Sequence, residues 1–478
     1  MRPGSPFLFT IPATGSLPLR YSARDLPAGL SVNATDGRIT GTITDRTPRA
    51  YQVTLSVSNP LGTVHRELRI VVGDEIALTP PMGWNSWNCW ARVVDADKLL
   101  KTARSMAERL KGHGWTYINV DDSWQGRRSG PSLAIQPNEK FPDMAKMIEE
   151  IHAMGLKFGL YSSPWITSYA GYNGGSSDTP DGAWVKPTNR AEELAFRHKG
   201  KFAFDESDAK QWAEWGVDYL KYDWNPNDLP TTRRMGDALR AQPRDIVYSI
   251  SNKTPFEQAE EFSQIAQLWR TGADMGDFWE KDPVMTPKGY NSVLDVWDNE
   301  ERWNKFCRSG RWPDPDMLVV GLVGWGKDLH PSRLTADEQY THISLWALWS
   351  APLLIGCPID GMDDFTFNLL SNDEVLDVNQ DSLALRAATI VQAGEIRVLA
   401  KKLEDGSMAV GLFNRSTEKA PARVTFAQLG ITGEQTVRDL WRQKDLGAFR
   451  NEFSTEVRPH GVVFVKISAR TAPTSPPN

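Results

Sequence analysis

The chain of 478 residues is longer than one ordinary domain, so we expect two or three domains. Hydrophobic residues make up 40% and charged residues 24% of it, as in an ordinary globular protein, and the net charge of -6 argues against a nucleic acid or an anionic membrane as a partner. No apolar run approaches the roughly 18 residues of a transmembrane helix, so no membrane span is expected. The three cysteines, Cys89, Cys307 and Cys357, are too widely spaced for a metal-binding motif or a disulfide framework.

Residues 1–74 are all-β in character. The runs at 51–58 and 66–72 alternate or are continuously apolar, and the turn signal Asn59-Pro60 lies between them. We therefore predict a separate β domain at the start of the chain. The first ten residues lack the charged start and long apolar stretch of a signal peptide.

From about residue 77 to residue 382 the pattern changes to alternating strands and helices. The predicted strands are 82–87, 117–122, 157–163, 219–224, 246–251, 268–274, 317–321 and 352–356. Helical patterns separate most of them; Leu99, Ala103 and Met106, for example, share one helix face. Eight such units in about 300 residues favour a (β/α)8 barrel over residues 75–384. The alternative, an open doubly wound sheet, would need a glycine-rich phosphate loop after its first strand, and the sequence has none.

Residues 385–469 return to β patterning. The segment 396–414 is typical of a hairpin around Asp405-Gly406, and 462–468 is a further predicted strand. This pattern predicts a small antiparallel β-sandwich packed on the barrel. The tail at 470–478 is rich in Pro, Ser and Thr and is predicted to be disordered.

Four aspartates stand at the ends of predicted barrel strands. Asp121 and Asp122 end the second strand, Asp223 ends the fourth and Asp274 ends the sixth. Side chains just past the C-terminal ends of such strands face the catalytic end of a barrel. Carboxyl groups there can serve as nucleophile and as acid and base on a sugar, and the flanking tryptophans suit the face of a sugar ring. Taken singly, each aspartate could equally be a helix N-cap or a salt-bridge partner.

Two of these aspartates, Asp223 and Asp274, have neighbours that suit different roles in sugar chemistry. Lys221 lies two residues before Asp223 and so points to the same side of the strand, where its ammonium would keep the carboxylate ionised. Asp274 suits the acid role if its apolar neighbours, Ala273 and Met275, raise its pKa.

A set of motifs in chain order carries a family resemblance. The motifs are PPMGWNSWNCW, YINVDDSWQG, GLKFGLYSS, WGVDYLKYDW, WRTGAD, WPDPDMLVVG, SAPLLIG and VNQD. Together they resemble glycoside hydrolase family 27, the family of α-galactosidases (melibiases) and α-N-acetylgalactosaminidases. The resemblance implies a catalytic (β/α)8 TIM barrel, a C-terminal antiparallel β-sandwich and a retaining mechanism that uses no metal or other cofactor.

A second resemblance concerns the N-terminal domain. The stretch LPAGLSVNATDGRITGTI is similar to an immunoglobulin-like, cadherin-like module that is common in secreted bacterial proteins. It implies an Ig-like β-sandwich over residues 1–74 and a secreted or periplasmic location. The whole chain is therefore expected to be multidomain, with the barrel flanked by two β-sandwiches.

The family resemblance assigns roles residue by residue. Asp223 matches the nucleophile and Asp274 the acid/base. Asp121 and Asp122 match the pair that hydrogen-bonds the axial 4-hydroxyl and the 6-hydroxyl of galactose. The other matches are Trp87 as an aromatic wall, Tyr161 at the end of the third strand, Lys221 beside the nucleophile and Arg270 at the 2-position of the sugar. Without the family resemblance, Trp87 and Tyr161 could equally be ordinary core residues. Lys221 and Arg270 could equally be partners in structural ion pairs. Asp314 and Asp316, near a predicted strand start, are interpreted as structural.

Three features depart from the family pattern. No cysteine follows Asp223 to form the bridge that eukaryotic members carry, and the segment 182–204 is longer than expected. Ser251 stands near the position where α-galactosidases usually carry a Glu, and α-N-acetylgalactosaminidases carry a serine there. However, Lys253 and Thr254 do not match the small residues of the acetamido-specific enzymes. We therefore predict an α-galactosidase, with α-N-acetylgalactosaminidase as the alternative and Ser251 as a substrate-binding residue.

The expected partner is a galactose-containing oligosaccharide or glycan. Two other classes of function stay open at this stage. One is a catalytically inactive carbohydrate-binding protein, which the intact pair of Asp223 and Asp274 argues against. The other is a surface-attachment protein, which would bind through residues 1–74 alone.

Overall fold

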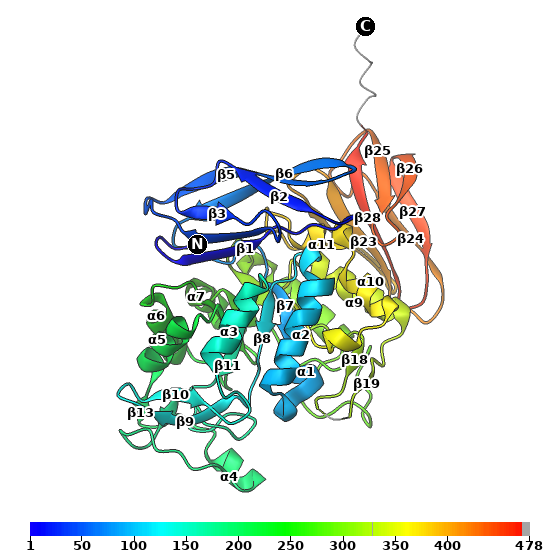
Figure 1. Cartoon of the computed structure of the whole chain (residues 1–478). Coiled ribbons are helices and arrows are strands. Elements are labelled where there is room, and N and C mark those ends of the chain that lie inside the picture. The colour runs from blue at the N-terminus through cyan, green and yellow to red at the C-terminus, as the bar shows by residue number, and fades with distance from the viewer. Residues whose placement is uncertain (327, 471–478) are drawn as a thin grey trace.

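The computed structural model describes residues 1–326 and 328–470. Apart from its first residue, the tail predicted to be disordered lies outside the described residues. Figure 1 shows N-terminal β-structure (blue) across one end of a central barrel and C-terminal β-structure (orange and red) beside both. Within the described residues, no helix is both long and apolar enough to cross a membrane.

The N-terminal β-structure is a sandwich of two three-stranded antiparallel sheets, with orders β1-β4-β3 and β2-β5-β6. Its strands are β1 (Pro6–Thr10), β2 (Arg20–Arg24), β3 (Leu30–Val32), β4 (Arg38–Thr42), β5 (Arg49–Asn59) and β6 (Gly62–Val72). Ile39, Val53 and Ile70 are buried between the sheets. The predicted Ig-like β-sandwich is confirmed.

The central sheet has eight strands in the order β17-β16-β15-β14-β11-β8-β7-β20, and each neighbouring pair is parallel. The strands are β7 (Met82–Asn85), β8 (Tyr117–Asn119), β11 (Lys157–Ser162), β14 (Tyr219–Asp223), β15 (Val247–Ser251), β16 (Leu268–Arg270), β17 (Trp312–Asp314) and β20 (Leu353–Ile355). A bridge between Leu318 and Ile355 closes the sheet. These segments are largely apolar because a parallel barrel covers both faces of its strands, and polar residues such as Lys221 and Arg270 occur toward their C-terminal ends. The predicted (β/α)8 barrel is confirmed.

The seventh strand was predicted wrongly. The structure places it at Trp312–Asp314 rather than at 317–321, where only Leu318 makes a bridge. Between the two segments, Pro315 has no N–H to donate and Asp316 adopts a φ of 103°, so the extended ladder is interrupted. The apolar residues after Asp316 are buried in irregular backbone, which a strand pattern cannot distinguish from a buried strand.

Helices follow the barrel strands in the sequence. They are α1 (Trp87–Trp90), α2 (Ala96–Arg109), α3 (Met144–Ala153), α4 (Arg190–Ala195), α5 (Asp205–Trp215), α6 (Leu229–Arg240), α7 (Ala259–Ile265), α8 (Val293–Glu300), α9 (Ala336–Leu348), α10 (Asp364–Leu370) and α11 (Asp373–Asn379). All except α4, which has no buried residue, pack around the barrel. In α2, Leu99, Ala103 and Met106 are buried on one face, as their spacing predicts. Helix α9 begins with a capping box formed by Thr335 and Glu338.

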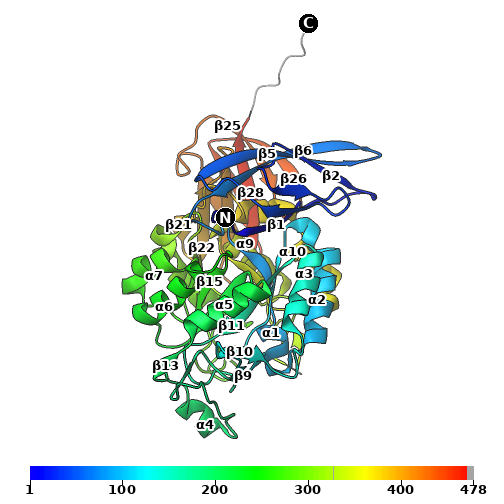
Figure 2. The ribbon, with the colours of Figure 1, turned by 60° about the vertical axis from the view of Figure 1, so that its left-hand side comes forward.

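Short strands extend the loops that follow the barrel strands. They are β9 (Gln125–Ser129), β10 (Ala134–Pro137), β12 (Ser176–Ser177), β13 (Phe202–Ala203), β18 (Leu322–Val323) and β19 (His330–Pro331). Figure 2 shows β9, β10, β13 and α4 at the end of the barrel opposite the N-terminal module. The loops at the C-terminal ends of the strands are therefore free of that module.

The N-terminal module contacts the end of the barrel where strands begin. Arg2 forms an ion pair with Asp245 (2.8 Å), shortly before β15, and Thr10 Oγ1 donates to the carbonyl of Gly155 (2.7 Å), shortly before β11. A cavity of about 1370 Å³ lies along this junction. It is remote from the four aspartates that the sequence singles out, so the site must be sought at the opposite end.

The C-terminal region is an antiparallel sandwich with a six-stranded sheet of order β21-β22-β23-β28-β25-β26 and a pair formed by β24 and β27. Its strands are β21 (Ala388–Ala393), β22 (Ile396–Lys402), β23 (Met408–Asn414), β24 (Ala420–Thr425), β25 (Glu434–Asp439), β26 (Lys444–Arg450), β27 (Glu452–Val457) and β28 (Val462–Ala469). The predicted hairpin around Asp405-Gly406 joins β22 and β23. Arg386 leads into the sandwich and forms a fully buried ion pair with Glu300 of α8, which ties the sandwich to the barrel.

Candidate active site

The predicted site residues meet at the C-terminal ends of neighbouring barrel strands. Asp223 ends β14, and in the parallel register it lies beside Ser251, which ends β15. The same register places Lys221 of β14 beside Tyr161 of β11. Strand β8 ends at Asn119, earlier than predicted, so Asp121 and Asp122 lie just past its C-terminal end, after Val120. The strand ends thus bring together side chains that are up to 130 residues apart in the sequence.

Asp223 is a buried carboxyl with one hydrogen-bond donor next to it. The side-chain amide of Asn252 donates to its Oδ1. Burial raises the pKa of Asp223 to about 7, because a charge is poorly solvated there; the Lys221 ammonium lowers it, and the carboxylates of Asp274 and Asp121 raise it further. Asn252 follows β15 with a φ of 67°, a conformation that Asn tolerates better than most residues. The sequence did not single out Asn252.

Lys221 connects the nucleophile candidate to Asp121. Its Nζ lies 2.8 Å from Asp121 Oδ2. Burial would lower the pKa of the ammonium, but the carboxylates of Asp121 and Asp223 outweigh burial and raise it. Lys221 therefore stays protonated and supplies the positive charge on which the ionisation of Asp223 depends.

The carboxylate of Asp122 is largely engaged by the protein. It accepts hydrogen bonds from Ser168 Oγ (2.7 Å), the Ala170 N–H (2.7 Å) and Gln125 Nε2 (3.1 Å). Three of its roughly four acceptor positions are therefore occupied. Burial raises the pKa of Asp122 to about 6 even though these donors favour the ionised form. Through these hydrogen bonds the Asp122 carboxylate holds the loop after β11 over the strand ends. The position of Asp122 in the sequence did not indicate this role.

That loop also brings Tyr169 to the site. The Tyr169 hydroxyl lies 3.3 Å from the Asn252 side-chain amide, which itself contacts Asp223. Arg197, in the long segment after the loop, stacks over the Tyr169 ring at 4.6 Å. Ser168, Tyr169 and Ala170 were all missed by sequence analysis, because nothing in the loop's composition distinguishes residues that support a carboxylate from ordinary loop residues.

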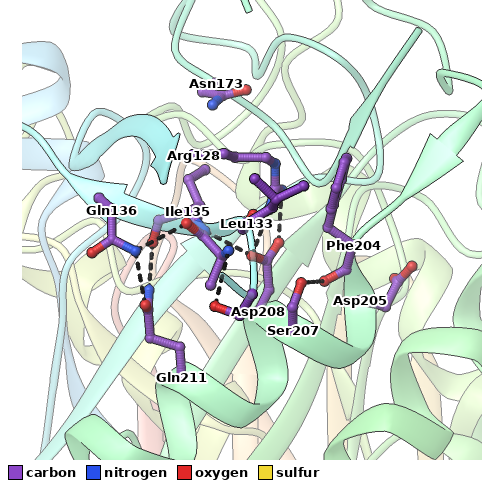
Figure 3. A network of polar contacts seen from close by, with 12 residues as sticks. Arg128, Leu133, Ile135, Gln136, Asn173, Phe204, Asp205, Ser207, Asp208 and Gln211 are labelled. Atoms are coloured by element: carbon purple, nitrogen blue, oxygen red, sulfur yellow. Dashed lines mark hydrogen bonds and ion pairs between the residues drawn. The ribbon is translucent and has the colours of Figure 1, made fainter. Parts of the chain in front are cut away.

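A buried polar network holds the base of this loop (Figure 3). Arg128 of β9 forms a bidentate ion pair with Asp208 of α5 (2.7 and 2.8 Å), and both side chains are fully buried. The same guanidinium donates to the carbonyls of Gly174 (2.8 Å) and Leu133 (2.9 Å), and it lies over the ring of Phe204. One side chain thus ties the β9–β10 hairpin, the loop after β11 and helix α5 together.

Asp274 has different surroundings. Its side chain is 52% exposed, on the loop that follows β16, and Arg270 Nη2 approaches its Oδ1 at 3.4 Å. The same Arg270 nitrogen forms a shorter ion pair, 2.7 Å, with the buried Oδ2 of Asp316. Asp316 also accepts the Met275 N–H (2.6 Å), so it fixes both Arg270 and the backbone next to Asp274.

The position of Asp316 corrects the sequence interpretation. Asp314 and Asp316 were placed near the start of the seventh strand, but Asp314 ends β17 and Asp316 lies beyond it. Both are therefore at the catalytic end of the barrel. Burial raises the pKa of Asp316 to about 6, and Arg270 lowers it. Its contacts with Arg270 and Met275 agree with a structural role, but that role is exercised inside the site.

The two aromatic candidates come from the ends of two different barrel strands, β7 and β11. Trp87 begins α1, directly after β7, and is half-buried. Tyr161 is buried in β11, and its hydroxyl has no hydrogen bond of normal geometry within the described residues. Burial, and then the charges of Asp223 and Asp122, raise the pKa of the Tyr161 hydroxyl. Burial raises the pKa of Asp223, but the Tyr161 hydroxyl lies close enough to that carboxyl to lower it, so the hydroxyl is placed beside the nucleophile candidate. Among the described residues, no cluster of three or more His, Cys, Asp or Glu side chains has the arrangement to hold a metal ion.

Family models cover most of the chain. A model described as alpha galactosidase A matches residues 79–182 and 191–381, and one described as the C-terminal β-sandwich domain of alpha galactosidase matches 393–467. An Ig domain model matches residues 2–73. The gap at 183–190 falls within the segment that the sequence indicated as longer than usual.

Comparisons with individual proteins and solved structures indicate the same family. Alpha-galactosidase 2 of Arabidopsis thaliana is 33% identical over 413 residues, which cover 84% of this chain and 93% of that protein. A Bacteroides fragilis crystal structure superposes with a TM-score of 0.85 at 31% identity and covers 98% of this chain and 95% of its own. A β-L-arabinopyranosidase of Geobacillus stearothermophilus superposes with a TM-score of 0.70 at 27% identity, over 84% of this chain and 98% of its own. The chain belongs to the α-galactosidase (melibiase) family of glycoside hydrolases.

Proposed function

We propose that this glycoside hydrolase removes terminal α-linked galactose from oligosaccharides with retention of anomeric configuration. The observation that carries the proposal is the contrast between two carboxyl groups at the same barrel end. Asp223 is buried beside the Lys221 ammonium, whereas Asp274 is half exposed beside Arg270. Retaining glycosidases need this division between a carboxyl that attacks and a carboxyl that exchanges protons with the leaving group and with water.

In the proposed mechanism, Asp223 attacks the anomeric carbon and forms a glycosyl-enzyme. Attack requires the ionised carboxylate. Lys221 favours that form by its charge, and Asn252 favours it by a hydrogen bond. Burial works in the other direction, so a bound sugar meets a carboxylate that water does not stabilise and that reacts readily.

Asp274 then serves as acid and afterwards as base. It donates a proton to the leaving oxygen in the first step and removes one from the attacking water in the second. Its exposure gives water access for the second step. Arg270 and Asp316 hold the segment that carries Asp274, because the Asp316 carboxylate pairs with the Arg270 guanidinium and accepts a hydrogen bond from the Met275 N–H.

The sugar is proposed to be galacto-configured. Asp121 has one oxygen paired with Lys221 and the other bonded to the Asp122 N–H, so about two of its roughly four acceptor positions are free, and Asp122 keeps about one. Such acceptors suit the axial 4-hydroxyl and the 6-hydroxyl of galactose. The curated relative at 33% identity is named an α-galactosidase, which supports the same choice. The β-L-arabinopyranosidase relative acts on a sugar that lacks the 6-hydroxymethyl group, so recognition of the 6-hydroxyl by the pair Asp121 and Asp122 would distinguish galactose from that sugar.

The alternative sugar, α-N-acetylgalactosamine, is favoured by one observation. Ser251 is buried directly beside Asp223 in the strand register and has a small side chain. A small residue leaves room for an acetamido group. Room alone discriminates weakly, however, whereas a buried hydrogen-bonding partner discriminates by several powers of ten. We therefore keep galactose as the proposed sugar.

The two catalytic aspartates should fail in different ways. Asp223→Asn should abolish turnover of all α-galactosides, because no glycosyl-enzyme forms. Asp274→Asn should slow natural oligosaccharides strongly and activated aryl galactosides much less, since a good leaving group needs no proton. Azide should partly restore turnover to Asp274→Asn alone. Steady-state rates with both substrate types, with and without azide, check this. Equal responses of the two variants would contradict the assigned roles.

The pH profile should report the environment of Asp223. Because its pKa is raised to about 7 and attack needs the ionised form, kcat/KM should fall as pH drops through this range rather than near pH 4. Lys221→Met removes the cation that lowers this pKa, so the acid limb should move to higher pH. Lys402→Met, an exposed lysine of β22, is the matched control and should leave the limb in place. An unmoved or lowered acid limb in Lys221→Met would refute the proposed role of the ammonium.

A panel of aryl glycosides tests the sugar assignment. We expect the highest kcat/KM for p-nitrophenyl α-galactoside, ahead of the α-N-acetylgalactosaminide and the β-L-arabinopyranoside. The measurement is kcat/KM for each at the same pH. A preference of more than about tenfold for the acetamido sugar, which corresponds to roughly 1.4 kcal/mol of transition-state binding, would reverse the assignment.

A further inference from the structure

An aromatic pair lies beside Asp274 and has no part in the mechanism described above. Tyr290 and Trp325 meet edge to face, with ring centroids 5.8 Å apart, and both are half-buried. Tyr290 comes from the loop after β16, and Trp325 comes from the β18–β19 hairpin, which follows β17. The two rings are thus contributed by different loops at the catalytic end of the barrel.

Backbone contacts place Tyr290 next to Asp274. The N–H of Asn291 donates to the carbonyl of Asp274 (2.8 Å), and the N–H of Gly276 donates back to the carbonyl of Asn291 (2.9 Å). After burial, the carboxylates of Asp274 and Asp316 are the main influences that raise the pKa of the Tyr290 hydroxyl, to about 12. The Tyr290 ring therefore lies on the same side of the site as the proposed acid/base.

Trp325 is held in an uncommon conformation. Its φ is 53°, a left-handed value that bulky residues seldom adopt. Its N–H donates to the carbonyl of Asn88 (2.9 Å), and the next N–H, of Gly326, donates to the carbonyl of Cys89 (3.0 Å). Both acceptors belong to α1, the helix that begins at Trp87, and Figure 1 shows β18 and β19 near this helix. Strained residues persist where surrounding contacts over-determine them, and they are frequent at functional sites.

The two loops are also fastened to each other. Asp277, three residues after Asp274, has a fully buried side chain that accepts the Arg333 N–H (2.8 Å) and the Arg333 guanidinium (2.8 Å). This contact joins the loop after β16 to the segment after β19. The two loops that carry the aromatic pair are therefore held in place before binding, so a ligand that binds there loses little free energy to ordering them.

The position of the aromatic pair relative to the two catalytic carboxyl groups indicates which part of a substrate would contact it. In a retaining mechanism, the group that protonates the leaving oxygen lies on the side of the leaving group, and the nucleophile lies on the opposite face of the anomeric carbon. Tyr290 lies beside Asp274, because the N–H of the next residue, Asn291, donates to the Asp274 carbonyl. Flat aromatic faces bind the C–H faces of sugar rings.

We propose that Tyr290 and Trp325 form a binding subsite for the leaving sugar ring, so that they determine which oligosaccharides the enzyme prefers. The proposal rests on the proposed α-galactosidase function and extends it. Because the pair contacts only the leaving group, it contributes to turnover when the leaving group is a sugar and contributes nothing when the leaving group is a single atom.

Two substrates separate these cases. α-Galactosyl fluoride has no leaving sugar and needs no proton from Asp274, whereas an α-1,6-linked galactosyl-glucose disaccharide has a full ring at that position. Trp325→Ala should lower kcat/KM on the disaccharide at least about tenfold and leave kcat/KM on the fluoride within about twofold. Tyr290→Ala should show the same pattern, and Trp325→Phe, which keeps a ring, should recover much of the disaccharide activity.

Trp215→Ala is the matched control. Trp215 is also half-buried and pairs edge to face with another tryptophan, Trp124, but it lies at the end of α5 on the outside of the barrel. It should change both substrates by the same factor, and thermal melts of all variants would show that they fold. Equal losses on fluoride and disaccharide in Trp325→Ala, or no loss on either, would overturn the subsite. A wild-type enzyme that hydrolyses neither substrate would instead overturn the proposed function, and the subsite with it.

Discussion

The constraint on which this site depends is the balance of charge at the buried end of the barrel. Asp121, Asp122, Asp223 and Asp316 are all buried there, and burial raises the pKa values of Asp122, Asp223 and Asp316. The buried ammonium of Lys221 and the buried guanidinium of Arg270 offset this tendency, through pairs of 2.8 Å with Asp121 and 2.7 Å with Asp316. Each cation thereby acts on a catalytic candidate: Lys221 on Asp223, and Arg270 on Asp274, which it approaches at 3.4 Å.

The barrel supplies positions, and the loops complete the site. Parallel register alone places Asp223, Ser251, Lys221 and Tyr161 side by side. The loop after β11 is held at the site by the donors that Asp122 accepts and by the Arg128 guanidinium, which donates to the carbonyl of Gly174 at the base of the loop. Polar contacts of this kind are costly to bury unless every partner is satisfied, so they fix loops in one arrangement. The N-terminal module takes no part in this scaffold, since it contacts the opposite end of the barrel.

The sequence was sufficient for the architecture and for the acids at the strand ends. Short, largely apolar runs that end in Asp121, Asp122 and Asp223 are a strong signal, because parallel strands are buried on both faces and present their next residues to the catalytic end. The seventh strand was misplaced, because the buried residues after Asp316 have the same apolar pattern as a strand. Pro315 was the visible sign that the ladder stops there.

Loop contacts could not be predicted in the same way. Ser168 and Ala170 lie 46 and 48 residues from the Asp122 carboxylate that they contact, and one of these contacts is made by a backbone N–H, which has no sequence signature. Asn252 was visible next to Ser251, but only the left-handed backbone after β15 turns its amide toward Asp223. Site residues on strands could be predicted from hydrophobic periodicity and from their position at a strand end. Site residues that act through the geometry of a loop could be identified only from the structure.

The identity of the nucleophile is the claim on which the account depends most, and trapping the glycosyl-enzyme tests it directly. A galactosyl fluoride whose ring carries a second fluorine forms the covalent intermediate but loses it slowly. Mass spectrometry of the treated enzyme should show one added fluorogalactosyl group, and peptide mapping should place it on Asp223. A label on Asp274 or on another residue, or no label on an enzyme that still turns over α-galactosides, would contradict the account.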